Sequence, residues 1–385
     1  MQAHSLRARG GILLLAALLV ACTAAPRDAR PAATPTAAGV TGAPAAPASA
    51  GPSPAVGTAA APAPLSPPVQ VRYGALLTLG LAPFLIAEQR GYFTEEELDA
   101  DFNRFDSGAR MVAPLSAGQL EVGAGSHSAG LFNALASGID LKIVADNGTL
   151  IPGRNTSQIV ARKELVDAGF RGGDDLRGRT FAFTATGSTV HINVVRYLDL
   201  NGVRPEELTL TEMGFPDMNA ALANGAIDLA DQAEPLATLG ADQGYLTRLM
   251  GVADYYPNRE VSVLMYGRTF VERQPEAARR FMVAYLRGIR AYEDAFTKNV
   301  DREAVLDLLI ERLPVKDRSI YERMLPDGTL LYLNPDGAVA TESIAWDQDW
   351  LAQHGLVRTK VDLGQVIDHS FVDYALGRLG RYAAR

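Results

Sequence analysis

From residue 69 onward, hydrophobic and polar side chains alternate with two different spacings. Short runs rich in β-branched and aromatic residues have the period of two that is typical of strands, and the runs between them have helical spacing. Strands separated by helices predict an α/β architecture with mostly parallel sheets. The predicted strands are residues 69–77, 98–105, 120–124, 141–147, 157–162, 180–184, 209–213, 226–230, 246–251 and 260–266, and the predicted helices are residues 83–90, 111–117, 131–136, 190–198, 216–223, 235–241 and 276–296.

The segment from Gly178 to Leu198 predicts a strand, a tight turn and a helix. Gly187 allows the backbone to turn, and Ser188 and Thr189 are residue types that cap the N-terminus of a helix. Free N–H groups, two hydroxyls and the positive end of the helix dipole would face whatever lies in front of such a helix. We interpret the segment as a contact for a small ligand. The alternative is an ordinary helix cap.

Two stretches about a hundred residues apart resemble each other. Residues 115–124 and 222–231 each have the pattern of a helix end, a glycine, and a short strand that carries an acidic residue. A polar loop follows each stretch. The repeat predicts two lobes of related build, with a ligand cleft between them at the carboxyl ends of the strands.

The N-terminus has the pattern of a signal peptide, predicted here as residues 1–21. Arg7 and Arg9 precede an apolar run over residues 11–20 that is too short to span a membrane permanently. The residues that follow resemble the lipobox of bacterial lipoproteins, which implies cleavage before Cys22 and acylation of that residue. Several acyl chains would anchor the chain stably to a membrane. The alternative is an ordinary signal peptide with a chance cysteine.

The amino-acid composition distinguishes a tether, residues 22–68, from the folded part of the chain that begins at residue 69. Residues 22–68 are almost entirely Ala, Pro, Thr, Gly and Ser, which predicts an extended, disordered tether. The formal net charge is −8 and no Lys/Arg block follows the signal, so we expect no nucleic-acid partner. Cys22 is the only cysteine, which excludes an internal disulfide framework and a cysteine-based metal site.

Five segments in a fixed order carry a resemblance to a known family. They are residues 87–93 (AEQRGYF), 115–125, 186–189 (TGST), 222–231 and the pair Glu234-Pro235. Together they resemble the periplasmic solute-binding proteins for nitrate, taurine and alkanesulfonates, a group that includes proteins similar to the thiamine-pyrimidine enzyme of yeast. The resemblance covers residues 69 to about 292.

The resemblance implies a two-lobed, type II binding-protein fold. Residues 69–152 and 259–385 would form lobe one and residues 153–258 lobe two, with crossovers near residues 150–155 and 255–260. It further implies a monomer, held to the cell membrane by lipid and facing the periplasm or cell exterior. Such a protein delivers a small-molecule ligand to an ABC permease driven by an ATPase. We expect no catalytic residue, metal or cofactor.

The predicted ligand contacts follow from the loops that would line the cleft. Hydroxyls and amides at these places can fix a polar ligand by geometry, and aromatic rings can wall it or stack on it. The candidates are Phe84, Ser107, Ser126, His127, Asn147, Gly187, Ser188, Thr189, Phe215, Asp231 and Tyr255. Each aromatic has core packing as its alternative, and for His127 the alternative is a place at the start of a helix.

The charges near these loops favour a ligand that is not an anion. The loops contain almost no Arg or Lys, whereas tight oxyanion sites often add one. Asp231 would supply an acceptor in the cleft, while Glu234 is interpreted as a structural feature of the Glu-Pro pair. We therefore expect a heteroaromatic or vitamin precursor, such as a thiamine pyrimidine or riboflavin. The alternative is an alkanesulfonate, taurine or nitrate.

Three other classes of protein remain as alternatives. A surface hydrolase would use Ser128, whose neighbours resemble a nucleophile elbow that lacks its first glycine, with His191 or His369 as the base. A pyrimidine synthase of the yeast type has a cysteine-rich stretch, and the mature chain has no free thiol. A structural or adhesive lipoprotein would not need the paired polar loops.

Overall fold

The computed structural model describes residues 64–383. The predicted signal peptide, Cys22 and the tether as far as residue 63 lie outside the described residues. Within residues 64–383, none of the helices has the length and apolar character needed to cross a bilayer.

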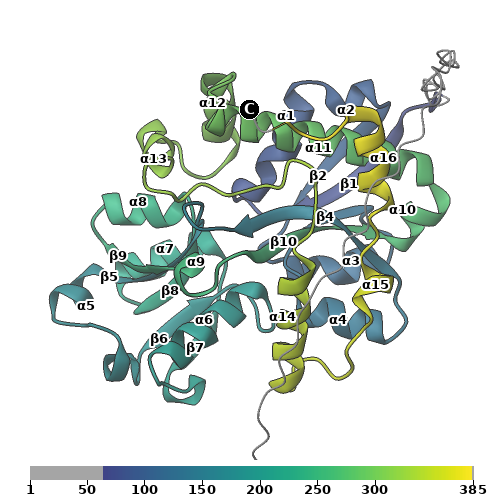
Figure 1. Ribbon diagram of the computed structural model, residues 1–385. Coiled ribbons are helices and arrows are strands. Elements are labelled where there is room, and N and C mark those ends of the chain that lie inside the picture. The colour runs from purple at the N-terminus through teal and green to yellow at the C-terminus, as the bar shows by residue number, and fades with distance from the viewer. Residues whose placement is uncertain (1–63, 384–385) are drawn as a thin grey trace, which may run out of the picture. The chain divides into compact units, whose positions relative to one another are not determined.

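Two five-stranded sheets form the framework, and they have the same topology (Figure 1). Their strand orders are β2-β1-β3-β10-β4 and β7-β6-β8-β5-β9. In each sheet four strands run in one direction, and the fourth strand in the order, β10 or β5, runs antiparallel to both neighbours. The strands are β1 Val69–Ala75, β2 Leu98–Arg104, β3 Val122–Gly125, β4 Leu141–Leu150, β5 Ser157–Arg162, β6 Thr180–Phe183, β7 Thr209–Glu212, β8 Leu229–Ala233, β9 Leu246–Gly251 and β10 Arg259–Gly267.

Each antiparallel strand, β5 or β10, is the first strand that the chain forms after it crosses from one sheet to the other. The chain passes from the first sheet to the second between Leu150 and Ser157, and it returns between Gly251 and Arg259. The α/β class and the two-lobed build predicted from the sequence are thus confirmed. The expectation of mostly parallel sheets holds for every strand except the two that follow a crossing.

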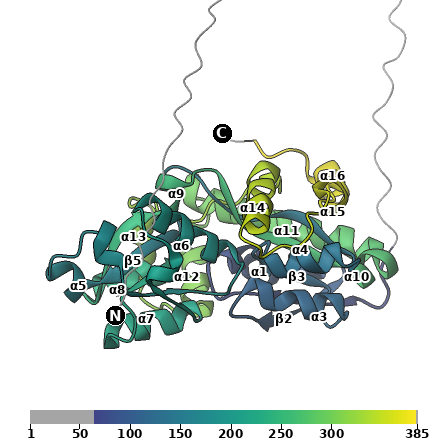
Figure 2. The same cartoon turned by 90° about the horizontal axis from the view of Figure 1, so that it is seen from below.

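Helices cover both sheets (Figures 1 and 2). The α-helices are α1 Ala82–Gln89, α2 Tyr92–Glu95, α3 Val112–Ser116, α4 Ala129–Ala136, α5 Lys163–Asp167, α6 Thr189–Leu200, α7 Phe215–Asn224, α8 Leu236–Asp242, α9 Val252–Tyr255, α10 Arg268–Arg273, α11 Pro275–Thr297, α12 Arg302–Arg312, α13 Arg318–Met324, α14 Thr341–Gln353, α15 Leu363–Val366 and α16 Ser370–Leu379. Short 3₁₀ helices are η1 Leu79–Leu81, η2 Gly108–Met111, η3 Gly173–Leu176 and η4 Pro205–Glu207.

The long helix α11 organises the core of the first lobe. The predicted apolar face is confirmed, because Phe281, Tyr285, Ile289 and Tyr292 are all fully buried. Burial of each such side chain contributes roughly 1.5–3 kcal/mol. The face packs against α1 and α16, so the C-terminal helices complete the core that the first strands begin.

Two C-terminal helices contact the second lobe by different means. In Figure 1, α13 lies above strand β10 and α14 lies below it. Next to α13, Arg323 pairs with Asp242 at 2.7 Å and Arg248 pairs with Asp327 at 3.5 Å. Arg323 and Asp242 are 45% and 41% exposed, so this contact is solvated. The contacts of α14 are buried and are described below.

The contact between α1 and α11 yields a test of the packing. A Cβ atom at Gly288 in α11 would lie 2.1 Å from the carbonyl oxygen of Pro83, whereas one at Gly377 in α16 would meet nothing within 4 Å. We expect Gly288→Ala to lower the free energy of unfolding by about 1–3 kcal/mol, because backbone must shift. Gly377→Ala should raise it by about 0.5–1 kcal/mol through helix propensity. Urea unfolding measures both, and equal stability of the two variants would contradict the close approach.

Candidate functional site

A cavity of about 100 Å³ lies between the two sheets. It sits at the carboxyl ends of the parallel strands β1, β3, β6 and β8, where the sequence predicts the cleft. Helix α6, the start of α7 and strand β10 complete the walls. The lining residues are Ala75, Leu76, Thr78, Leu79, Gly80, Gly108, Ala124, Gly125, Ser126, Asn147, Thr156, Ser157, Thr184, Thr189, Val190, Asn193, Phe215, Ala233, Glu234, Val261, Ser262 and Leu331.

Four of the predicted contacts line this cavity, namely Ser126, Asn147, Thr189 and Phe215. The structure brings them together from both sheets. The polar groups of two of them are already occupied. Asn147 donates to the Gly80 carbonyl and to Tyr285 Oη, both at 2.9 Å, and Thr189 Oγ1 donates to the Val261 carbonyl at 3.0 Å.

Phe84, Ser107 and Tyr255 do not line the cavity. Phe84 is fully buried in the core, stacked on Tyr73 with ring centroids 4.8 Å apart, because the apolar face of α1 turns inward. Ser107 Oγ accepts the Ala109 N–H at 3.2 Å and caps η2. Tyr255 Oη donates to the Asn193 carbonyl at 3.0 Å. These side chains support the walls from behind.

The turn before α6 also stands behind the wall. Ser188 caps α6, with its Oγ accepting the His191 N–H at 3.2 Å, so it makes the ordinary cap that the sequence left as an alternative. Gly187 has φ +72°, and its carbonyl accepts the Ala129 N–H from the first lobe at 2.8 Å. A Cβ at Gly187 would lie 2.5 Å from the Ala129 Cβ, so glycine is required by the close approach of the lobes as well as by the turn.

Asp231 lies one layer behind the cavity. Its carboxylate accepts Ser157 Oγ at 2.6 Å and Asn193 Nδ2 at 2.7 Å, and both of these donors are lining residues. Burial raises the pKa of Asp231 to about 7, against the lowering effect of the two hydrogen bonds. Because Asp231 holds the amide nitrogen of Asn193, the amide oxygen is left for another donor.

Glu234, not Asp231, is the carboxylate in the cavity wall. The sequence pattern ends strand β8 at residue 230, but the strand continues to Ala233, which moves Asp231 into the sheet and places Glu234 at the strand end. Glu234 is 1% exposed, and burial raises its pKa while nearby Arg248 lowers it. Oε2 accepts the Thr238 N–H at 2.9 Å, and Oε1 lies 3.8 Å from Arg248 Nε.

Three buried polar atoms on lining residues have no hydrogen-bond partner among residues 64–383. They are Ser126 Oγ, Asn193 Oδ1 and Glu234 Oε1. The first comes from the first lobe and the other two from the second. A buried acceptor without a donor costs about 1–3 kcal/mol, so Asn193 Oδ1 and Glu234 Oε1 suit a ligand that brings N–H or O–H groups, whereas the Ser126 hydroxyl can donate or accept. Within the described part of the chain, no Arg or Lys lines the cavity.

Sequence reasoning missed Asn193 and Ser157 as lining residues. Asn193 follows Thr189 by four positions on α6, so the two share a helix face. With Thr189 as a candidate, the helical spacing also predicts Asn193 as a lining residue. Ser157 opens β5 directly after the first crossing.

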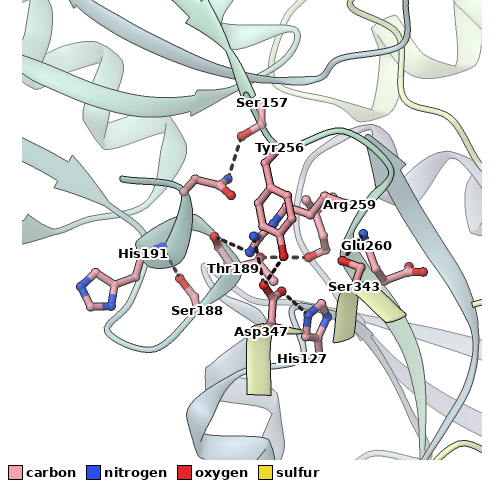
Figure 3. A network of polar contacts seen from close by, with 12 residues as sticks. His127, Ser157, Ser188, Thr189, His191, Tyr256, Arg259, Glu260, Ser343 and Asp347 are labelled. Carbon is pink, nitrogen blue, oxygen red and sulfur yellow. Dashed lines mark hydrogen bonds and ion pairs between the residues drawn. The ribbon is translucent and has the colours of Figure 1, made fainter. Parts of the chain in front are cut away.

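His127 is fully buried away from the cavity, and Figure 3 shows its surroundings. Its Nε2 lies 2.7 Å from Asp347 Oδ2 on α14. Asp347 is itself fully buried. The interpretation of His127 as the start of a helix is close to its place, two residues before α4.

Comparison with known proteins agrees with the architecture. The model of the family described as NMT1/THI5 like matches residues 79–295. A Brucella abortus protein described as a binding protein is 25% identical over 259 residues, which cover 66% of this chain and 76% of that protein.

Solved structures share the fold. The alkanesulfonate-binding protein SsuA from Xanthomonas axonopodis, bound to MOPS, matches with a TM-score of 0.64 and 18% identity over 80% of this chain and 100% of that chain. The periplasmic nitrate-binding protein NrtA from Synechocystis matches with a TM-score of 0.67 and 14% identity, covering 81% of this chain and 89% of that chain. The fold is therefore that of a periplasmic binding protein.

The pKa of Asp231 predicts a pH dependence of stability. The folded state keeps this proton up to about pH 7, whereas an unfolded Asp loses it near pH 4. The contribution to stability is complete below about pH 4 and is lost as the pH rises through 7. We expect the free energy of unfolding to fall between pH 4 and pH 8 by up to about 4 kcal/mol more in the wild type than in Asp231→Asn.

Denaturant unfolding at several pH values measures this difference. Asp199→Asn is the control, because Asp199 is exposed at the end of α6. Parallel pH profiles for the wild type and Asp231→Asn would contradict the buried, protonated state of this carboxyl.

Proposed function

The chain belongs to the NMT1/THI5-like family, and on that basis we propose that it is the extracytoplasmic solute-binding component of an ABC importer. The cavity between the two sheets would hold the ligand. A ligand that touches both walls stabilises the closed arrangement of the lobes in proportion to its preference for that state. The closed protein would then deliver the ligand to a permease driven by an ATPase.

The proposal also includes the lipid anchor, the tether and the boundaries of the lobes. Acylation at Cys22 and the tether through residue 68 would hold the binding protein, as a monomer, at the outer side of the cell membrane. The lobes would comprise residues 69–152 with 259–385, and residues 153–258. The chain itself would carry out no chemistry.

The ligand class rests on one observation, the buried atoms of Ser126, Asn193 and Glu234 that have no hydrogen-bond partner in the described part of the chain. We propose a neutral or singly cationic ligand with several N–H or O–H donors. Pockets for drug-sized ligands usually measure about 300–1,000 Å³, so a cavity of about 100 Å³ favours one ring over a flavin. An aminopyrimidine has this size and these donors.

An oxyanion ligand is the second candidate, because one feature favours it. Thr189 and Val190, in the first turn of α6, line the cavity, and a helix N-terminus attracts anions. The two solved structures described above are those of an alkanesulfonate-binding protein and a nitrate-binding protein. Against this reading stand the buried carboxylate of Glu234 and a lining without Arg or Lys.

The geometry gives no support to the hydrolase. Ser128 Oγ accepts the Leu131 N–H and caps α4, and His191 Nδ1 accepts the Gly187 N–H. His369 stands at the N-terminus of α16. A serine nucleophile needs a base within hydrogen-bonding reach, and in the described part of the chain no hydrogen bond joins Ser128 to His191 or His369.

A thermal-shift and calorimetry panel tests the ligand class. The probes are aminopyrimidines, riboflavin, taurine, an alkanesulfonate and nitrate, each added to the purified full-length protein. We expect an aminopyrimidine to stabilise the fold by about 2.7 kcal/mol at 100 times its Kd, with no effect of the anions. Stabilisation by an anion alone would favour the second candidate, and no response to any probe would count against solute capture.

Glu234→Gln distinguishes the two candidates by the sign of its effect. Loss of the charged acceptor should raise the Kd of an aminopyrimidine about 10- to 100-fold, because hydrogen bonds to charged groups contribute about 1.5–3 kcal/mol. The same change should tighten the binding of a sulfonate by removing a like charge. Glu206→Gln, at an exposed glutamate of the second lobe, is the control and should change neither. Isothermal titration measures all three proteins.

A further inference from the structure

Helix α14 lies outside the segment that the family model matches, yet it contacts both walls of the cavity. Figure 3 shows the contacts, which meet at the carboxylate of Asp347. Oδ2 lies 2.7 Å from His127 Nε2. Oδ1 lies 3.1 Å from Arg259 Nη1 and accepts Tyr256 Oη at 3.0 Å.

Two partners of Asp347, His127 and Arg259, connect to residues of the cavity walls. His127 is adjacent in sequence to Ser126, which lines the cavity on the side of the first sheet. Arg259 Nη2 donates to the Thr189 carbonyl at 3.1 Å, and Thr189 lines the cavity on the side of the second sheet. One carboxylate therefore connects the strand-end loop of one lobe with the first turn of α6 in the other.

Aromatic contacts hold the same helix against α6. The Arg196 guanidinium lies 4.4 Å from the Trp346 ring centroid and 4.6 Å from that of Tyr256. One turn further along α14, the Trp350 ring lies edge-on to His191 with centroids 6.1 Å apart. Two successive turns of α14 thus pack against α6.

We propose that Asp347 and Arg259 are positioning residues of the binding cavity, and that α14 is a strap that fixes Ser126 and Thr189 relative to each other. Both side chains of the pair are fully buried, so water cannot replace either partner. Removal of one charge leaves the other uncompensated in the interior, and the two walls lose their common link. That the cavity binds a ligand rests on the proposed function, whereas the strap can be tested without any ligand.

The chain carries its own reporter for the strap. It has two tryptophans, Trp346 and Trp350, and both lie on α14 against α6. In the ligand-free full-length protein we expect Asp347→Asn to shift tryptophan emission to longer wavelength and to raise the acrylamide quenching constant at least 2-fold. Asp349→Asn is the matched control, because Asp349 lies on the same helix in a solvated pair with Lys360. It should leave both signals unchanged.

Hydrogen exchange read by mass spectrometry separates positioning from general loss of stability. In Asp347→Asn we expect residues 126–131 and 187–193 to exchange at least 10-fold faster, with strand β2 and helix α12 unchanged. Faster exchange in α14 alone, or an equal increase everywhere, would overturn the proposal. If Asp347→Asn does not fold, Asp347→Glu keeps the charge but displaces it, and the same two segments should respond. A failure of every ligand probe would reject the proposed function and leave this result standing.

Discussion

The buried guanidinium group of Arg259 constrains how the segments between the two sheets pack. Arg259 stands at the start of β10 and is fully buried. Transfer of such a charge out of water costs several kcal/mol, so compensating groups must surround it. The Asp347 carboxylate, the Thr189 carbonyl and the Tyr256 ring, 4.4 Å from the guanidinium carbon, supply them. The second crossing, helix α14 and helix α6 therefore all contact the same guanidinium group.

The sequence predicted most of what depends on short-range pattern. The strands, the cap at Ser188 and the apolar face of α11 follow from spacings within a few residues, and each is present. The cavity also lies at the predicted strand ends. The roles of Asp231 and Glu234 were exchanged, because propensity locates a strand end only to within a few residues. A shift of that size decides which carboxylate faces the cavity.

The remaining features depend on contacts between distant residues. His127 and Asp347 are 220 positions apart, and nothing in the local pattern around either residue encodes their pairing. Phe84 is a second case in which the local sequence pattern does not determine the role of a residue. An aromatic residue near a strand-end loop can wall a cleft or fill a core, and only the position of Tyr73 and Tyr285 decides for the core.

The two contacts of the C-terminal helices with the second lobe differ in their response to solvent. The pairs beside α13, Arg323 with Asp242 and Arg248 with Asp327, include side chains that are more than 40% exposed, and dissolved salt screens such pairs. The cluster around Asp347 is closed to ions. Dissolved salt therefore weakens the link beside α13 and leaves the buried link through Asp347 unchanged.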